Sequence, residues 1–246
     1  MKRIVAAVRN GLRGKAVAWA AAAWCGCSAV WAQAPSAPSP DAGLKEVRLD
    51  DTAFARGAPL PAWSLPLAEV PATTRRTPVV LRLAETQFNV APEKAYLVNR
   101  AIQVNDASSL AQIGQYAIQF VPQYQRVALH RLEILRGSEV LQRAEQVQLR
   151  FLERETGLEG GVYSGAVTAV MLLSDVRVGD TLRIVYSVTG DNPVFAAKFS
   201  DSASWDQGEP TERRRVTLLA PADRRIEWRM HGDYRSARVR PDETRR

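Results

Sequence analysis

Residues 162–190, VYSGAVTAVMLLSDVRVGDTLRIVYSVTG, contain two apolar runs joined by a short polar segment. In the second run, TLRIVYSV, alternate residues from Leu182 to Val188 fall on one face, which is the pattern of a half-buried strand. The dipeptide Gly179-Asp180 supplies the backbone freedom that a tight return needs. We therefore predict a β-hairpin, since a lone Gly-Asp lacks the glycine spacing and the following helix of a phosphate-binding loop.

The same period of two recurs on both sides of this stretch. It is present in YAIQFV (116–121), in VQLRFLERE (147–155) and in RRIEWRM (224–230). Turn residues separate runs of this kind at the spacing typical of antiparallel sandwiches. The sequence therefore predicts an all-β fold, an antiparallel β-sandwich of roughly ten to twelve strands over residues 79–240.

Helical patterns are scarce in this chain. The stretch DASSLAQIG, residues 106–114, begins with a candidate N-cap, Asp106, and predicts one or two helical turns. We find no alternation of strands with long helices and no internal repeat.

The segments outside the predicted sandwich have their own compositions. Residues 1–32 combine a basic start, an apolar run and small residues before a cleavage site after Ala32, as in a signal peptide. A retained anchor is the alternative, but the apolar run is shorter than the ~20 residues of a membrane span. Residues 33–78 are rich in Pro, Ala and Ser, and from 57 to 78 we expect an extended surface segment without a strand. Residues 241–246 form a charged tail.

Removal of the signal peptide changes the charge and the cysteine content. The whole chain has 33 basic and 26 acidic residues, and five of the basic residues lie within 1–32. The mature charge of about +2 does not favour a nucleic-acid partner. Both cysteines, Cys25 and Cys27, also leave, so no disulfide and no cysteine nucleophile is expected. We expect a periplasmic or secreted protein without a cofactor, a metal site or a stable membrane span.

His130 and Trp205 are two candidate binding residues. His130 lies in RVALHRLEILR (126–136), where Ala128, His130, Leu132 and Ile134 are predicted to share a face. It is either a half-buried general base or, as we favour, a histidine with satisfied hydrogen bonds. Trp205 lies in a loop-like context and either anchors packing or stacks on a ligand.

Glu153 and Glu155 are the other two candidates, because they lie two residues apart on one strand face. Such a pair suits a calcium ion or a glycosidase-like mechanism. Arg150 and Arg154 lie beside them, and interleaved opposite charges are more typical of an exposed strand face. No motif of a hydrolytic triad accompanies any of the four candidates, so no catalytic residue is assigned.

The order of these segments resembles the DUF3857 family over residues 96–230. The resemblance rests on YLVNRAIQV (96–104), on the RVALHRLEILRGSEVL hairpin (126–141), on the stretch quoted first and on FAAKFSDSASWDQGEPTERRRVTLLAP (195–221). Members of this family commonly precede a transglutaminase-like core in bacterial envelope proteins. That core would bring a Cys-His-Asp triad, and no position of this sequence matches it.

The resemblance implies a non-catalytic, exported accessory domain. Such a module would position a transglutaminase-like catalytic domain, or another envelope protein that is its substrate, through strand edges and loops. The alternatives are a stand-alone periplasmic hydrolase or a glycan-binding module that uses surface carboxylates, and a structural or adhesive module.

Overall fold

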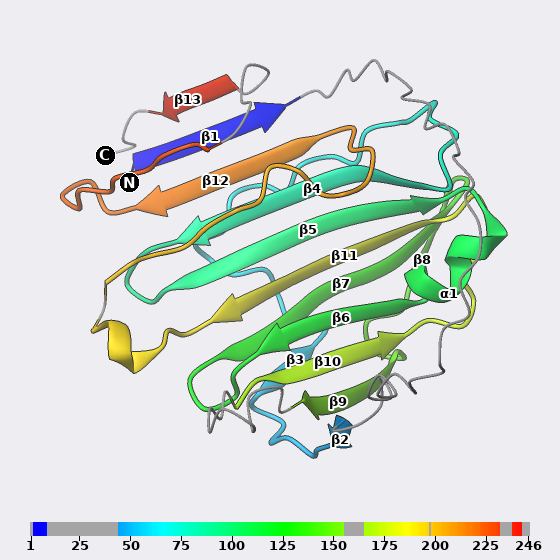
Figure 1. The fold of residues 1–246 in the computed structure, drawn as a ribbon, viewed down its shortest axis with the longest axis horizontal. Coiled ribbons are helices and arrows are strands. Elements are labelled where there is room, and N and C mark those ends of the chain that lie inside the picture. Colours follow the sequence, from blue (N-terminus) through cyan, green and yellow to red (C-terminus); the bar gives the residue numbers. More distant parts are fainter. Residues whose placement is uncertain (1, 9–43, 155–164, 197, 232–237, 243–246) are drawn as a thin grey trace, which may run out of the picture.

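A computed structural model describes residues 2–8, 44–154, 165–196, 198–231 and 238–242, and the described chain is mostly strands in two sheets (Figure 1). The nine-stranded sheet has the order β13 (Arg238–Asp242), β1 (Lys2–Val8), β12 (Arg214–Ala220), β4 (Val79–Asn89), β5 (Ala95–Val104), β11 (Thr181–Thr189), β7 (Arg126–Arg136) and β3 (Phe54–Arg56), with β8 (Glu139–Gln142) also beside β7. The four-stranded sheet has the order β2 (Leu44–Glu46), β9 (Gln148–Arg154), β10 (Val167–Leu172) and β6 (Gln115–Phe120). The all-β prediction is confirmed, and most pairs are antiparallel.

In the described residues, helical structure is confined to short pieces. The predicted turns at 106–114 are confirmed as η1 (Ala107–Ser109) followed by α1 (Leu110–Ile113), and the Asp106 side chain accepts a hydrogen bond from the Ser108 N–H. A further 3₁₀ turn is η3 (Pro193–Phe195). No helix in the described part of the chain is long and apolar enough to cross a bilayer.

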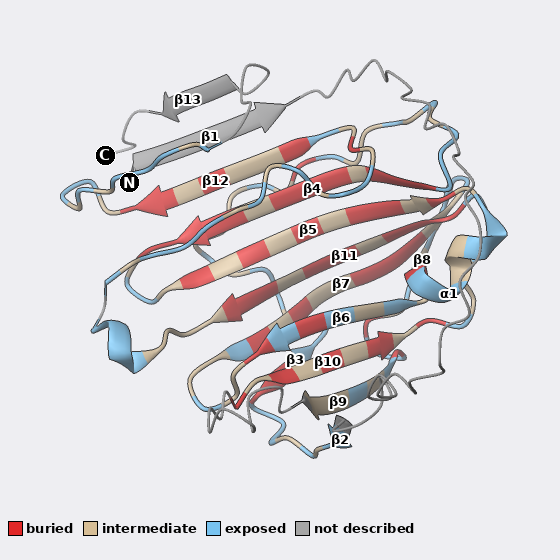
Figure 2. Ribbon diagram, in the orientation of Figure 1, coloured by how far each residue is buried: buried red, intermediate tan, exposed pale blue. Residues whose placement is uncertain are grey.

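The main core lies between the two sheets. Alternate residues of β11 face the smaller sheet, and side chains of β10 and β6 pack against them. The fully buried members include Leu129, Leu132, Ile134, Leu182, Ile184, Ala169 and Met171. Figure 1 shows the smaller sheet displaced towards the β7 and β3 side, so that it covers only part of the larger sheet. Figure 2 shows β4 and β11 buried along most of their lengths, whereas β6 alternates between buried and exposed residues.

The hairpin predicted at 162–190 is wrong. β10 and β11 follow each other in the chain but belong to different sheets, because β10 pairs with β6 and β9 while β11 pairs with β5 and β7. Residues 173–180 therefore cross from one layer of the sandwich to the other. Alternation in sequence predicts each strand separately and says nothing about which strands pair.

Asp180 fixes the end of this crossover. Its carboxylate accepts hydrogen bonds from Arg136 Nε at 2.9 Å and Nη2 at 2.7 Å, and from the Arg177 N–H at 2.8 Å. Burial raises the pKa of the Asp180 carboxyl, but the hydrogen bonds and charge of Arg136 and the Arg177 amide outweigh it, so the pKa lies below its usual value. Asp180 thus has the turn-forming role that its position beside Gly179 suggests.

Residues 57–78, here called the strap, cross the opposite face of the larger sheet, behind the sheet in Figure 1. They contain no strand, as predicted. Side chains of the sheet bind their backbone: Gln87 Oε1 accepts from the Leu65 N–H at 2.8 Å, and Arg82 Nε donates to the Pro71 carbonyl at 2.8 Å. Polar side chains therefore replace the ladder bonds that a proline-rich segment cannot make.

Glu85 is the centre of this contact and is 1% exposed. Its Oε2 accepts hydrogen bonds from the Ala68 N–H of the strap and from Asn99 Nδ2 of β5, both at 2.8 Å. Its Oε1 accepts from Gln87 Nε2 at 2.9 Å and from Arg215 Nε of β12 at 2.8 Å. One buried carboxylate therefore joins three strands and the strap.

His130 lies on this strap-covered face, and the prediction that it shares a face with Leu132 and Ile134 is wrong. The pairing of β7 with β11 shifts register at this point, so the alternation of β7 is interrupted. His130 Nδ1 donates to the Ala58 carbonyl of the strap at 3.0 Å, and Nε2 accepts from Ser187 Oγ at 2.9 Å. The interpretation of His130 as a histidine with satisfied hydrogen bonds fits both contacts.

The strand predicted at 224–230 is also absent, because these described residues adopt no regular structure after β12. Trp228 is 49% exposed, which is unlike a core-facing strand residue. In the described part of the chain, residues 224–230 pair with no strand.

We predict that Glu85→Ala lowers the free energy of unfolding by about 3–5 kcal/mol, because it leaves the Arg215 guanidinium and the Ala68 and Asn99 donors without their acceptor. Chemical denaturation of the parent and the variant measures this difference. Glu209→Ala, which removes an exposed glutamate, is the matched control and should change stability by less than about 0.5 kcal/mol. Equal losses in both variants would contradict the central role of Glu85.

His130 should make stability depend on pH. Burial lowers the pKa of the His130 imidazole, against the raising effect of its hydrogen bonds to the strap backbone. The unfolded chain therefore takes up a proton at higher pH than the folded chain does, so this contribution is complete above about pH 6.5 and is lost as the pH falls below it. His130→Gln should flatten this part of the profile of unfolding free energy against pH, whereas His231→Gln, at an exposed position, should leave it unchanged.

Candidate functional site

The structure does not bring the four sequence candidates together. His130 faces the strap, Glu153 lies on β9 opposite Val167, and Trp205 lies in the segment between η3 and β12. Glu155 lies outside the described residues, so the carboxylate pair with Glu153 is untested. Within the described residues, no group of three His, Cys, Asp or Glu side chains is placed to hold a metal ion.

The edge of β6 is the first notable feature of the smaller sheet. The Leu173 N–H donates to the Gly114 carbonyl at 2.8 Å, and this pair continues the register of β10 and β6. Because hydrogen-bonded pairs alternate in an antiparallel ladder, Gln115, Ala117 and Gln119 direct their N–H and C=O groups away from β10. No described residue binds these groups, and all three side chains are exposed.

β6 also lacks the usual protection of an edge strand. Its sequence, QYAIQF, contains no charged residue and no proline, and at six residues it is longer than the edge strands β2 and β3. Natural edges are commonly short, charged, bulged or interrupted by proline. An extended segment of another chain could therefore pair with β6.

The face of β5 that is turned towards the smaller sheet, here called its inner face, lies next to β6. Tyr96, Val98 and Arg100 alternate along this face, and each is only partly buried. Tyr116 of β6 lies against Tyr186 of β11, with ring centroids 6.2 Å apart. Burial raises the pKa of the Tyr116 hydroxyl, and the neighbouring Arg100 guanidinium opposes this rise. Arg100 therefore lies directly beneath the edge strand.

Arg214 of β12 lies in register with Arg100, two strands away in the larger sheet. Arg100 pairs with Ala84 of β4, and Ala84 pairs in turn with Arg214. Arg214 is 5% exposed, and its Nη1 donates to the Ala84 carbonyl at 3.1 Å and to Thr86 Oγ1 at 3.0 Å. Burial, and then the positive charge of Arg100, lower the pKa of Arg214 to about 10.

We name Arg100 and Arg214 the arginine pair. Among the described residues no carboxylate forms an ion pair with either one, and Arg100 Nε is buried without a hydrogen-bond partner. Trp205 Nε1 is likewise buried without a hydrogen-bond partner among the described residues. The carbonyl of the preceding residue, Ser204, accepts a hydrogen bond from Arg214 Nε at 3.1 Å. Buried donors of this kind are uncommon in folded proteins.

Sequence reasoning missed the arginine pair. A signal was present for Arg100, because it stands among Tyr96, Val98 and Ile102 on one face of a well-defined alternation. A charged residue on the apolar face of a strand indicates either the edge of a sheet or a buried polar contact. Arg214 carried no comparable signal, since it is the middle one of three consecutive arginines.

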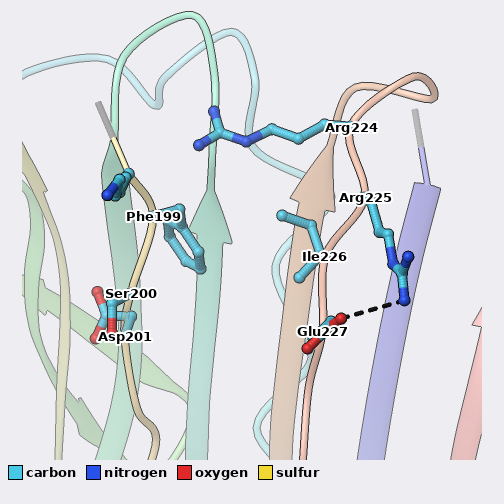
Figure 3. A pocket seen from close by; sticks show the side chains of 8 residues that line it. Phe199, Ser200, Asp201, Arg224, Arg225, Ile226 and Glu227 are labelled. Atoms are coloured by element: carbon cyan, nitrogen blue, oxygen red, sulfur yellow. Dashed lines mark ion pairs between the residues drawn. The ribbon is translucent and has the colours of Figure 1, made fainter. Parts of the chain in front are cut away.

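A separate hollow of about 450 Å³ lies between residues 198–201 and residues 224–227 (Figure 3). Figure 3 shows Arg224 and Ile226 on one side of it and Phe199 on the other. Arg225 and Glu227 pair at 3.2 Å but are 88% and 74% exposed, so the pair adds little stability. The mixed charge of its lining suits a polar ligand without specifying one.

The wall formed by Phe199 is held by a polar and aromatic cluster. Lys94 Nζ lies 5.5 Å from the Phe199 ring centroid and 3.8 Å from Asp201 Oδ2, and Phe199 packs on Phe88 at 6.5 Å. Burial, and then the charge of Asp201, raise the pKa of Tyr96 to about 12. The cluster is therefore a packing element, and Tyr96 remains a neutral phenol at neutral pH.

Comparison with solved structures adds little. A crystal structure of a candidate protease from Parabacteroides distasonis ATCC 8503 is 11% identical, with a TM-score of 0.42 over 48% of this chain. This chain spans 24% of that longer protein. No curated protein matches the sequence.

The model of one protein family does match, over residues 93–246. These residues include every strand from β5 onward, and with them the edge of β6 and the arginine pair. The chain therefore belongs to DUF3857, a domain of unknown function with solved structures.

Proposed function

We propose that this protein is an exported, non-catalytic binding module. In this proposal the edge of β6 docks an extended segment of a transglutaminase-like catalytic domain or of that domain's protein substrate. The match to DUF3857 supports this proposal, because the resemblance to that family implies a transglutaminase-like core as the partner. The signal peptide expected at residues 1–32 supplies the compartment, and Lys2–Val8 of that segment form β1 beside β12 in the full chain.

The observation that carries this proposal is the row of backbone groups on Gln115, Ala117 and Gln119 that no described residue pairs with. A strand added to a sheet edge gains main-chain hydrogen bonds, and its alternate side chains contact the neighbouring surface. Here that surface is the partly buried inner face of β5. Docking at β6 would thus combine backbone pairing with side-chain contacts.

The candidate residues fit a binding role better than a chemical one. His130 uses both ring nitrogens in contacts with Ala58 and Ser187. Asp175 and Asp180, the carboxylates of the crossover, are held by Arg143 and Arg136. Each of these groups already has a structural role, which supports the accessory function over a carboxylate-dependent hydrolase.

The substitution Gln119→Pro tests whether a partner segment docks on the edge of β6. Gln119→Pro removes one outward N–H and no ladder bond, so we expect the fold to persist and binding to weaken at least tenfold, about 1.4 kcal/mol. The measurement is isothermal titration calorimetry with a transglutaminase-like domain encoded in the same genome and produced separately.

Gln119→Ala is the matched control, because it shortens the same exposed side chain and keeps the N–H. It should bind as the parent does, and both variants should keep the parent's melting temperature. The proposal fails if the parent does not bind the domain, or if the proline and alanine variants bind equally well.

A further inference from the structure

We propose that the arginine pair binds a carboxylate side chain, Glu or Asp, carried by the strand that docks on β6. This inference rests on the proposed function and names the chemistry of the segment that would dock. It gives the edge of β6 a means of selecting one sequence over another.

The register of the strands places the two arginines on one face of the larger sheet. Arg100 and Arg214 are separated by one strand, on which Ala84 occupies the position between them. Neighbouring strands lie about 4.8 Å apart, so the two arginine backbones are roughly 10 Å from each other.

The charges favour an anion at this place. Two positive groups stand on one face, and burial first and then the charge of Arg100 lower the pKa of Arg214. Burying charge without an opposite charge is unfavourable, so a carboxylate between them would relieve the repulsion and accept from the unpartnered Arg100 Nε. A guanidinium presents parallel N–H groups that match the two oxygens of a carboxylate.

The position relative to β6 makes the source of that carboxylate a docked strand. Tyr116 of β6 lies against Arg100, so a strand paired with the free edge of β6 would pass over the inner face of β5. Stacked sheets lie about 10 Å apart, and alternate side chains of the added strand would point towards Arg100 across that distance. A glutamate and an arginine together span such a gap.

Two capped pentapeptides test the inference. One is acetyl-Thr-Val-Glu-Val-Thr-amide, and the other replaces its glutamate with glutamine. We expect the parent protein to bind the glutamate peptide at least tenfold more tightly, measured by isothermal titration calorimetry at constant ionic strength. Arg100→Gln should remove this preference without weakening the glutamine peptide, because only the charged contact is lost.

The controls separate this contact from general charge. Arg225→Gln removes an 88% exposed arginine and should keep the preference. Gln119→Pro should weaken both peptides, because it acts on the backbone edge and not on the arginine pair.

A second measurement detects carboxylate binding at Arg100 without requiring a strand to dock on β6. The buried Nε–H of Arg100 should give a distinct nitrogen–proton resonance, identified by its absence in Arg100→Lys. Glutarate at millimolar concentration should shift this resonance, and sodium chloride at equal ionic strength should not.

The outcomes distinguish the two proposals. If the two peptides bind equally well and Gln119→Pro weakens both, docking on β6 is supported and the carboxylate site is wrong. An Arg100 Nε–H signal that glutarate does not shift would also overturn the site. If glutarate shifts it and Gln119→Pro leaves the glutamate peptide bound, the site holds and docking on β6 is wrong.

Discussion

The Glu85 carboxylate joins the strap to β4, β5 and β12 through hydrogen bonds from Ala68, Asn99 and Arg215. The apolar cluster on this face is small, with only Ala68, Leu83 and Ala101 as buried members. The strap is also too rich in proline to pair as a strand. The contact between strap and sheet therefore depends on a buried polar network, in which every donor needs its acceptor.

The two faces of the larger sheet consequently have different physical characters. The outer face is closed by polar side chains that bind the backbone of the strap. The inner face is closed by apolar packing against the smaller sheet, but that sheet lies towards β7 and β3 (Figure 1). Arg100 lies on this inner face beside Tyr116 of β6, at the strand where the smaller sheet ends.

Much of the fold follows from local patterns. The alternation of YAIQFV gives β6 with Ile118 and Phe120 buried, and Asp106 caps the short helix as expected. The failures have non-local causes. β10 and β11 join different sheets because pairing depends on distant partners, and His130 changes face because a register shift in β7 is invisible in composition.

The candidate site was harder to predict than the fold. Chemical type alone indicates His130, Glu153, Glu155 and Trp205, and chemical type does not reveal which residues become neighbours. The arginine pair arises because β12 runs parallel to β4 and brings Arg214 level with Ala84 and Arg100. Residues so far apart in sequence come together through topology alone.

The family match begins at residue 93, yet β4 ends at Asn89. β4 is an interior strand that pairs with both β5 and β12, and it carries Glu85. A chain cut where the match begins would expose the edges of two strands at once and leave Asn99 and Arg215 without their shared acceptor. In this chain the larger sheet therefore extends beyond the stretch that the family model matches.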